Sequence, residues 1–238
     1  MRGLLLALVG LAAVAAPASA ARIPPPAERL KLSDERSYTR WAHPVARANA
    51  YRAPAERARV VTRLRLVTED GYPEVYVVLS SWADPRGDGW FQVRIPMRPN
   101  GKVGWVPASA LGRLRLVRTH LTVDRTRLRA TLRRNGRTVW RSPVGVGAPS
   151  TATPAGSFWI RERLRVSPPT GLYGPWAFGT SAYSALSDWP GGGVVGIHGT
   201  NQPQLIPGRP SHGCIRVPNP AVHRLARMMP LGTPVTIR

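Results

Sequence analysis

The chain has 238 residues and a formal net charge of +22, from 34 Lys and Arg residues against 12 Asp and Glu. A charge of this size favours anionic partners such as nucleic acid, anionic lipid or acidic polymers. One cysteine and five scattered histidines offer no tetrahedral ligand set, so we expect neither a metal nor another cofactor.

Residues 1–20 have the features of a secretory signal peptide. A positive start at Arg2 precedes an apolar run over residues 4–16 and a small-residue cleavage site at residues 18–20 (Ala-Ser-Ala). No cysteine follows that site to carry a lipid, and no later run is apolar for eighteen residues. We therefore expect a secreted protein without a transmembrane segment after cleavage, and secretion argues against nucleic acid as its working substrate.

Residues 21–57 are rich in Pro, Ala and Arg and have weak periodicity, which predicts a linker or wrapping arm. Farther along, ten arginines between residues 113 and 141 alternate with Leu and Val at close to period two. This spacing is typical of the solvated faces of strands, and we favour it over a dedicated site for a polyanion.

Residues 58–117 contain short apolar runs separated by turn signals. Asp-Gly and Asn-Gly pairs, at residues 88–89 and 100–101 for example, are strong hairpin signals, and about five strands in this length predict a small barrel. The pattern around Trp90 and Trp105 resembles the SH3-like modules of bacterial wall-associated proteins. We favour core positions for both Trp residues over a ligand-binding platform.

Residues 118–238 predict a second, mainly β domain. Strand patterns recur from residue 121 onwards, and Asn135-Gly136 predicts a hairpin turn. Asn219 followed by Pro220 predicts a helix N-cap and first helical position, so one short helix precedes a closing strand. Residues 167–193 show no clear period, and we interpret this segment as a lid or binding loop.

The only cysteine, Cys214, lies two residues after His212 and sixteen after His198. An odd cysteine in a secreted protein indicates an intermolecular bridge or a reactive thiol, although a free cysteine is also often a small buried core residue. An ordinary thiol is only a few per cent ionised at pH 7, so a nucleophilic Cys214 requires a base. A loop that folds back would bring His198 to it.

Residues 153–158 (Thr-Pro-Ala-Gly-Ser-Phe), 197–200 (Ile-His-Gly-Thr) and 211–216 (Ser-His-Gly-Cys-Ile-Arg) resemble the L,D-transpeptidase catalytic domain of the YkuD type. The last motif is highly specific. The resemblance implies a β-sandwich-like fold and an enzyme that cross-links or trims bacterial peptidoglycan, with a location at the cell wall. It implies a Cys214 nucleophile and a Gly199 carbonyl that holds His198 in one tautomer.

On this basis the remaining residues receive expected roles. The backbone N–H groups of Gly213 and Cys214 would form an oxyanion hole. Ser211 and His212 would either bind the substrate or brace the loop. Arg216 would hold a stem-peptide carboxylate, with an exposed salt bridge as the alternative. Two aromatic residues of the expected lid complete the substrate-binding set, which is Ser211, His212, Arg216, Tyr183 and Trp176.

The expected reaction starts from a tetrapeptide stem of peptidoglycan. Cys214 attacks the bond between the L-centre of the diamino acid and D-alanine, and the thioester is taken by an amine, which gives a 3→3 cross-link or a similar product. The alternatives are an L,D-carboxypeptidase, a Cys/His wall peptidase and a non-catalytic basic protein that binds anionic wall polymers. Papain-related wall peptidases place Cys before His, and here His198 comes first.

Overall fold

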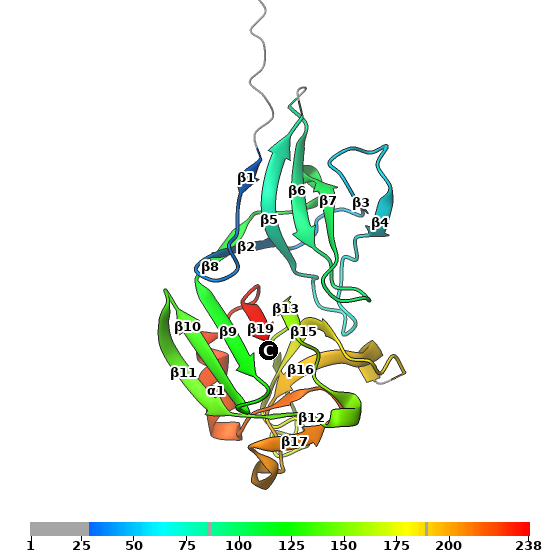
Figure 1. Ribbon diagram of the computed structural model, residues 1–238. Helices are drawn as coiled ribbons and strands as arrows, with labels where there is room; N and C mark the ends of the chain where they lie inside the picture. The colour runs from blue at the N-terminus through cyan, green and yellow to red at the C-terminus, as the bar shows by residue number, and fades with distance from the viewer. Residues whose placement is uncertain (1–28, 85–86, 189) are drawn as a thin grey trace, which may run out of the picture.

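The computed structural model describes residues 29–84, 87–188 and 190–238. The expected signal peptide, residues 1–20, and the first part of the expected arm lie outside these residues. Within the described part of the chain, no helix has the length and apolar character needed to span a bilayer. The strands fall into an N-terminal sheet and two C-terminal sheets, drawn at the top and the bottom of Figure 1.

The N-terminal sheet is antiparallel and has eight strands, in the order β4-β3-β7-β6-β5-β2-β8, with β1 paired to β5. Its core contains Tyr76, Val78, Val93 and Val106. Trp90 and Trp105 are 6% and 7% exposed, as expected for core positions. The elements are β1 (Leu30–Lys31), β2 (Thr39–Ala42), β3 (Asn49–Tyr51), β4 (Val60–Arg63), β5 (Tyr76–Ala83), β6 (Gly89–Arg94), β7 (Val103–Pro107), η1 (Ala108–Ala110) and β8 (Arg115–Val117).

The segment expected to be a linker or arm supplies part of this sheet. β2 pairs with β5 and β8, and β3 pairs with β4 and β7. These strands have two to four residues each, too few to produce the alternation that marks a strand in a sequence. The linker interpretation is therefore wrong for residues 30–51.

The C-terminal part consists of a five-stranded sheet, β11-β10-β9-β19-β13, and a six-stranded sheet, β14-β15-β16-β18-β12-β17. One core cluster joins them, with Leu121 and Val235 from the first and Phe178 and Ile197 from the second. The strands are β9 (Thr119–Asp124), β10 (Arg129–Arg134), β11 (Arg137–Pro143), β12 (Gly145–Gly147), β13 (Gly156–Trp159), β14 (Leu164–Arg165), β15 (Trp176–Tyr183), β16 (Val194–His198), β17 (Gly208–Ser211), β18 (Ile215–Arg216) and β19 (Pro234–Ile237).

One α-helix, α1 (Asn219–Met228), is present in the described residues, beside short 3₁₀ turns η2 (Pro149–Thr151), η3 (Pro190–Gly193) and η4 (Pro203–Leu205). α1 buries Val222 and Leu225 against the same core, as its spacing predicts. The hairpin between β10 and β11 has the expected turn, because Asn135 and Gly136 have φ values of 51° and 76°. The prediction of a mainly β fold with one short helix is confirmed for the part of the chain that the structure describes.

The segment 167–193 is only partly irregular. Its residues 176–183 form β15, which pairs with β14 and β16 and has six buried residues in succession. A strand buried on both faces shows no alternation of polar and apolar residues. The lid interpretation is wrong for β15 and remains open for residues 167–175.

The two parts of the molecule meet across a buried ion pair. Arg161 is 2% exposed and Glu74 is 0% exposed. Arg161 donates from Nε to Glu74 Oε1 over 2.7 Å and from Nη2 to Glu69 Oε2 over 2.9 Å. Trp159 beside it donates from Nε1 to the Val75 carbonyl over 2.7 Å. The loop between β4 and β5 is thereby fixed against the C-terminal sheets.

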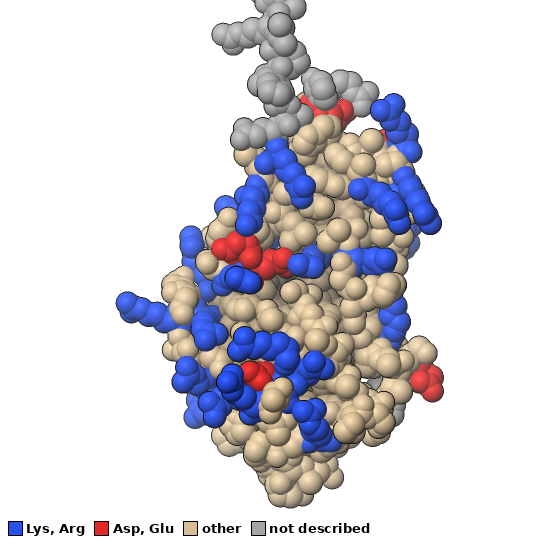
Figure 2. Space-filling view, viewed as in Figure 1, with Lys and Arg blue, Asp and Glu red and all other residues tan. Residues whose placement is uncertain are grey.

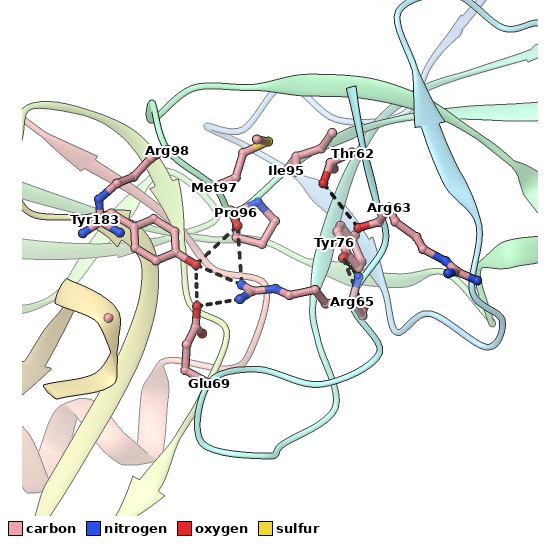
Figure 3. A pocket seen from close by; sticks show the side chains of 11 residues that line it. Thr62, Arg63, Arg65, Glu69, Tyr76, Ile95, Pro96, Met97, Arg98 and Tyr183 are labelled. Carbon is pink, nitrogen blue, oxygen red and sulfur yellow. Dashed lines mark hydrogen bonds and ion pairs between the residues drawn. The ribbon is translucent and has the colours of Figure 1, made fainter. Parts of the chain in front are cut away.

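Figure 3 shows the adjoining part of this interface, where Tyr183 reaches across from β15. Its hydroxyl accepts a hydrogen bond from Arg65 over 2.9 Å and donates to Glu69 Oε1. Asn100 pairs with the Tyr183 backbone in both directions, at 2.9 and 3.0 Å. Arg98 lies over the Tyr183 ring, 4.7 Å from its centroid.

Substitution of Glu74 tests this interface. Glu74→Gln leaves the buried Arg161 short of one negative charge, and we expect a loss of about 3 kcal/mol in unfolding free energy. Urea unfolding of the whole chain measures it. Arg127→Gln is the control, because the Arg127 side chain is exposed and an ion pair such as the one it forms with Asp124 adds little to stability in water. Equal, small effects of the two substitutions would contradict a stabilising role for the buried pair.

Candidate active site

A pair of parallel strands brings the cysteine and one histidine together. β16 and β18 are neighbours, with Ile197 opposite Ile215 and His198 opposite Arg216. His198 is the last residue of β16, and Cys214 directly precedes β18. The fifteen residues between them, 199–213, therefore form the fold-back loop that the sequence predicts.

The side chains of Cys214 and His198 both lie next to one glycine of β16, Gly196. A Cβ atom added to Gly196 would lie 3.7 Å from both Cys214 Sγ and His198 Cδ2. The Gly196 N–H donates to Cys214 Sγ over 3.4 Å. Cys214, His198 and Tyr173 line one cavity of about 290 Å³.

The orientation of His198 is set by the residue that follows it. His198 is 3% exposed, and its Nδ1 lies 2.6 Å from the Gly199 carbonyl oxygen, which is the contact that the resemblance implies. Because a carbonyl only accepts, Nδ1 carries the proton and Nε2 is left as a base. Tyr173 packs edge-on against the imidazole, with ring centroids 4.7 Å apart.

Burial keeps both side chains of the pair uncharged at neutral pH. It lowers the pKa of His198 to about 4, and the positive charge of Arg216 acts in the same direction while the Gly199 contact opposes it. Burial also raises the pKa of the Cys214 thiol above its ordinary value, although the Gly196 N–H and Arg216 lower it in part. The pair therefore rests as a thiol and a neutral imidazole.

Hydroxyl groups hold the loop that carries Cys214. Ser211 donates to the Cys214 carbonyl over 2.6 Å and accepts from the Gly213 N–H over 3.2 Å. Thr153, from the first motif, donates to the Gly213 carbonyl over 2.8 Å and accepts from the Gly147 N–H over 2.9 Å. Ser211 thus braces the loop.

The hydrogen bonds of this loop leave fewer backbone donors for the expected oxyanion hole. The Gly213 N–H is already bonded to Ser211, so of the two expected donors only the Cys214 N–H is left for an oxyanion. Gly213 has a φ of +121°, and a Cβ atom there would lie 3.2 Å from Ser184 Cβ. Backbone conformation and packing therefore both favour glycine at position 213.

Arg216 and His212 lie on opposite sides of Cys214 in the sequence. Arg216 donates from Nη1 to Gln202 Oε1 over 2.9 Å, and its buried Nε has no partner among the described residues. This guanidinium is half-buried, so it is not the exposed salt bridge of the alternative interpretation. His212 is exposed.

Asn219 is the residue whose role the sequence interpretation missed. Pro218 occupies the N-cap position of α1, and no side chain caps the helix. Asn219 Oδ1 instead accepts from the Thr200 N–H over 2.8 Å. A Cβ atom on Gly199 would lie 2.4 Å from that oxygen. The N-cap prediction is wrong, and Asn219 fixes the backbone beside His198. Its position three residues after the cysteine motif was the available signal.

The aromatic residues of segment 167–193 separate into two groups. Tyr183 faces the N-terminal sheet, as described above, and is not part of the wall of the Cys214 cavity. Trp176 is half-buried against the core, with Arg163 over its ring at 5.1 Å. Tyr173, which is 43% exposed, lies against His198, and Tyr173 and Phe178 both line the cavity.

No cluster of three or more His, Cys, Asp or Glu side chains in the described ranges is arranged to hold a metal ion.

A β-rich domain in which a half-buried thiol and a buried imidazole line one cavity has the side chains of a cysteine–histidine catalytic site. The family profile of the L,D-transpeptidase catalytic domain, YkuD, matches residues 118–237. The chain therefore belongs to the YkuD family.

Two curated relatives match part of the chain. A Bacillus subtilis protein, provisionally named L,D-transpeptidase YkuD, is 37% identical over 118 residues, which are 50% of this chain and 65% of that protein. Its Bacillus licheniformis counterpart is 38% identical over 95 residues, 40% of this chain and 50% of that protein. The chain thus spans less than two thirds of the length of either relative.

Solved structures of L,D-transpeptidases also match. The catalytic domain of the E. faecium enzyme is 26% identical and covers 50% of this chain and 96% of its own, with a TM-score of 0.38. An L,D-transpeptidase from Mycobacterium smegmatis is 14% identical and covers 63% of this chain and 90% of its own, with a TM-score of 0.42. Both scores are below 0.5, so the family assignment rests on the sequence matches.

The resting state of the thiol is testable by its reactivity. Because the pKa of Cys214 is raised and the pKa of His198 is lowered to about 4, no thiolate–imidazolium pair forms at neutral pH. We expect iodoacetamide labelling of Cys214 to accelerate about tenfold per pH unit from pH 6 to 8.5. Mass spectrometry of the labelled peptide gives the rate, with glutathione as the reference thiol. A fast plateau between pH 5 and 8 would show an ion pair instead.

The role of Asn219 predicts a selective loss of activity. Asn219→Ala removes the acceptor of the Thr200 N–H and loosens the Gly199 carbonyl that orients His198. We expect thiol acylation to slow by about tenfold and stability to fall by about 1 kcal/mol. His223→Ala, on the exposed face of the same helix, is the control. If both variants acylate at the wild-type rate, Asn219 does not position the base.

Proposed function

We propose that this chain is a cysteine-dependent L,D-transpeptidase that acts on peptidoglycan stem peptides outside the cytoplasm. The single observation that carries the proposal is the shared cavity of Cys214 and His198, with His198 Nδ1 held on the Gly199 carbonyl. Membership of the YkuD family supports the same chemistry. The acyl donor is a tetrapeptide whose third residue is a diamino acid and whose last is D-alanine.

The reaction proceeds in two acyl transfers. His198 Nε2 takes the thiol proton as Cys214 Sγ bonds to the carbonyl carbon of the diamino acid. The amide C–N bond then breaks, His198 returns the proton to the departing D-alanine amine, and a thioester remains. An amine of a second stem attacks the thioester, and its proton passes through His198 back to the sulfur, which regenerates the thiol.

Exclusion of water favours the amine over hydrolysis in the second transfer. Residues 167–175 are suited to this role, because Tyr173 of this segment contacts the imidazole at the cavity wall. Release of the thioester to water in place of the amine would make the enzyme a carboxypeptidase, and the same site would serve both reactions.

Three further features fit a cell-wall enzyme. Residues 1–20 have the pattern of a secretory leader. The N-terminal sheet is the proposed SH3-like module, with a role in wall binding. Figure 2 shows Lys and Arg side chains spread over both parts of one face rather than gathered in one patch, and this distribution suits diffuse attraction of anionic wall polymers.

The test of the proposed function is acylation of Cys214 followed by product analysis. A carbapenem-type β-lactam should add its mass to the wild-type chain and should not add to Cys214→Ala or Cys214→Ser. Incubation with muropeptides should then release D-alanine and form 3→3 dimers, detected by mass spectrometry. Muropeptide turnover that persists in Cys214→Ala, or a wild type that is never acylated, would rule the mechanism out.

A further inference from the structure

One end of the Cys214 cavity is acidic, and the proposed reaction does not use it. Glu162 and Asp70 both line this cavity. Glu162 lies between β13 and β14 of the C-terminal sheets, whereas Asp70 lies in the β4–β5 loop of the N-terminal sheet. The chain has 34 Lys and Arg residues against 12 Asp and Glu, so two carboxylates in the cavity of Cys214 are an unusual concentration of negative charge for this protein.

Glu162 lacks a partner for part of its carboxylate. The residue is 6% exposed, and its buried Oε1 has no hydrogen-bond partner among the described residues. Burial and the negative charge of Asp70 raise the pKa of Glu162 to about 7, although Thr68 and Arg161 act against this. An unsatisfied buried carboxylate costs free energy, and a ligand that supplies donors and positive charge removes that cost.

The Glu162 carboxylate and the Cys214 thiol lie over the same face of one sheet, as their positions beside two paired glycines show. Gly179 of β15 and Gly196 of β16 are direct partners in an antiparallel pair, so atoms added at their Cβ positions would point the same way. A Cβ on Gly179 would lie 2.2 Å from Glu162 Oε2, and one on Gly196 would lie 3.7 Å from Cys214 Sγ. Partner Cβ positions are about 5 Å apart, so the carboxylate lies within about 12 Å of the sulfur.

We propose that Glu162 and Asp70 form a subsite that binds the side-chain ammonium of a diamino acid in the stem peptide. This inference rests on the proposed function. An alkylammonium has three donors and one positive charge at the end of a flexible chain of about four carbons. When the carbonyl of the diamino acid is held at Cys214, the side chain of that residue therefore extends along the cavity towards Glu162 and Asp70. Asp70 makes the N-terminal sheet part of the substrate site.

The ammonium can come from the acyl donor or from the acceptor stem, and kinetics separates the two. The donors are a stem tetrapeptide with a free side-chain amine and the same peptide with that amine acetylated. For the wild type we expect kcat/KM for the free-amine donor to exceed that for the acetylated donor by about 10- to 100-fold. In Glu162→Gln this ratio should fall towards one.

Two further variants refine the test. Asp70 is exposed, so Asp70→Asn and Asp70→Lys preserve folding; the first should lower the ratio and the second should reverse the preference. Glu56→Gln, an exposed acidic residue outside the cavity, is the matched control and should keep the wild-type ratio. If the ammonium belongs to the acceptor, the wild type has nearly equal kcat/KM values for the free-amine and acetylated donors. In that case Glu162→Gln raises the KM of the acceptor peptide instead.

Binding without turnover keeps the two proposals distinguishable. Calorimetric titration of Cys214→Ala with the two donor peptides, and with the free-amine acceptor peptide and its acetylated form, should show tighter binding of one free-amine form. Adding Glu162→Gln to this variant should abolish the difference. Equal binding within both pairs overturns the ammonium subsite even if Cys214 turns peptides over. Selective binding with no turnover by the wild-type chain supports the subsite and overturns the transpeptidase reaction.

Discussion

The guanidinium of Arg161 is the interaction on which the arrangement of the molecule depends. It is buried where the C-terminal sheets meet the N-terminal sheet, and it bonds to both Glu74 and Glu69 of one loop. A charge in such a position is tolerated only when its hydrogen bonds are satisfied. The next residue, Glu162, lines the Cys214 cavity, and the same loop carries Asp70 to it. One short segment thus joins the two parts of the chain and shapes the site.

The catalytic pair follows from strand pairing. Ile197 and Ile215 are partners in the parallel pair of β16 and β18, so the residues next to them, His198 and Cys214, lie near each other, and backbone contacts then select the tautomer of His198. Burial leaves both groups uncharged, so the ion pair that activates many cysteine nucleophiles is absent at rest. In the proposed mechanism, proton transfer to His198 therefore coincides with the approach of a substrate carbonyl, so the rate depends on how well the reacting groups are positioned. Asn219, Ser211 and Thr153 meet that demand by fixing the two loops.

Local patterns were enough to predict the motif residues, the hairpin at Asn135-Gly136 and the helix after residue 219. They failed where burial is decided by distant segments. β15 was missed because both of its faces are covered and its alternation disappears. Glu162 stands in an Arg-Glu-Arg run that is typical of solvent-exposed strands, and only contact with a loop some ninety residues upstream buries it. The N-cap assigned to Asn219 followed a sound local rule that a tertiary hydrogen bond overrides.

Charge acts on two length scales in this protein. The arginines of the exterior give a field that is felt over roughly a Debye length, about 8 Å at physiological ionic strength, and this field attracts any polyanion whatever its orientation. The Glu162–Asp70 subsite acts only on a group already inside the cavity, where salt screens poorly. Raised salt weakens the first interaction and leaves the second nearly intact. The proposed selection of the peptide and the proposed attraction to wall polymers would therefore be independent, because they depend on charges of opposite sign in different surroundings.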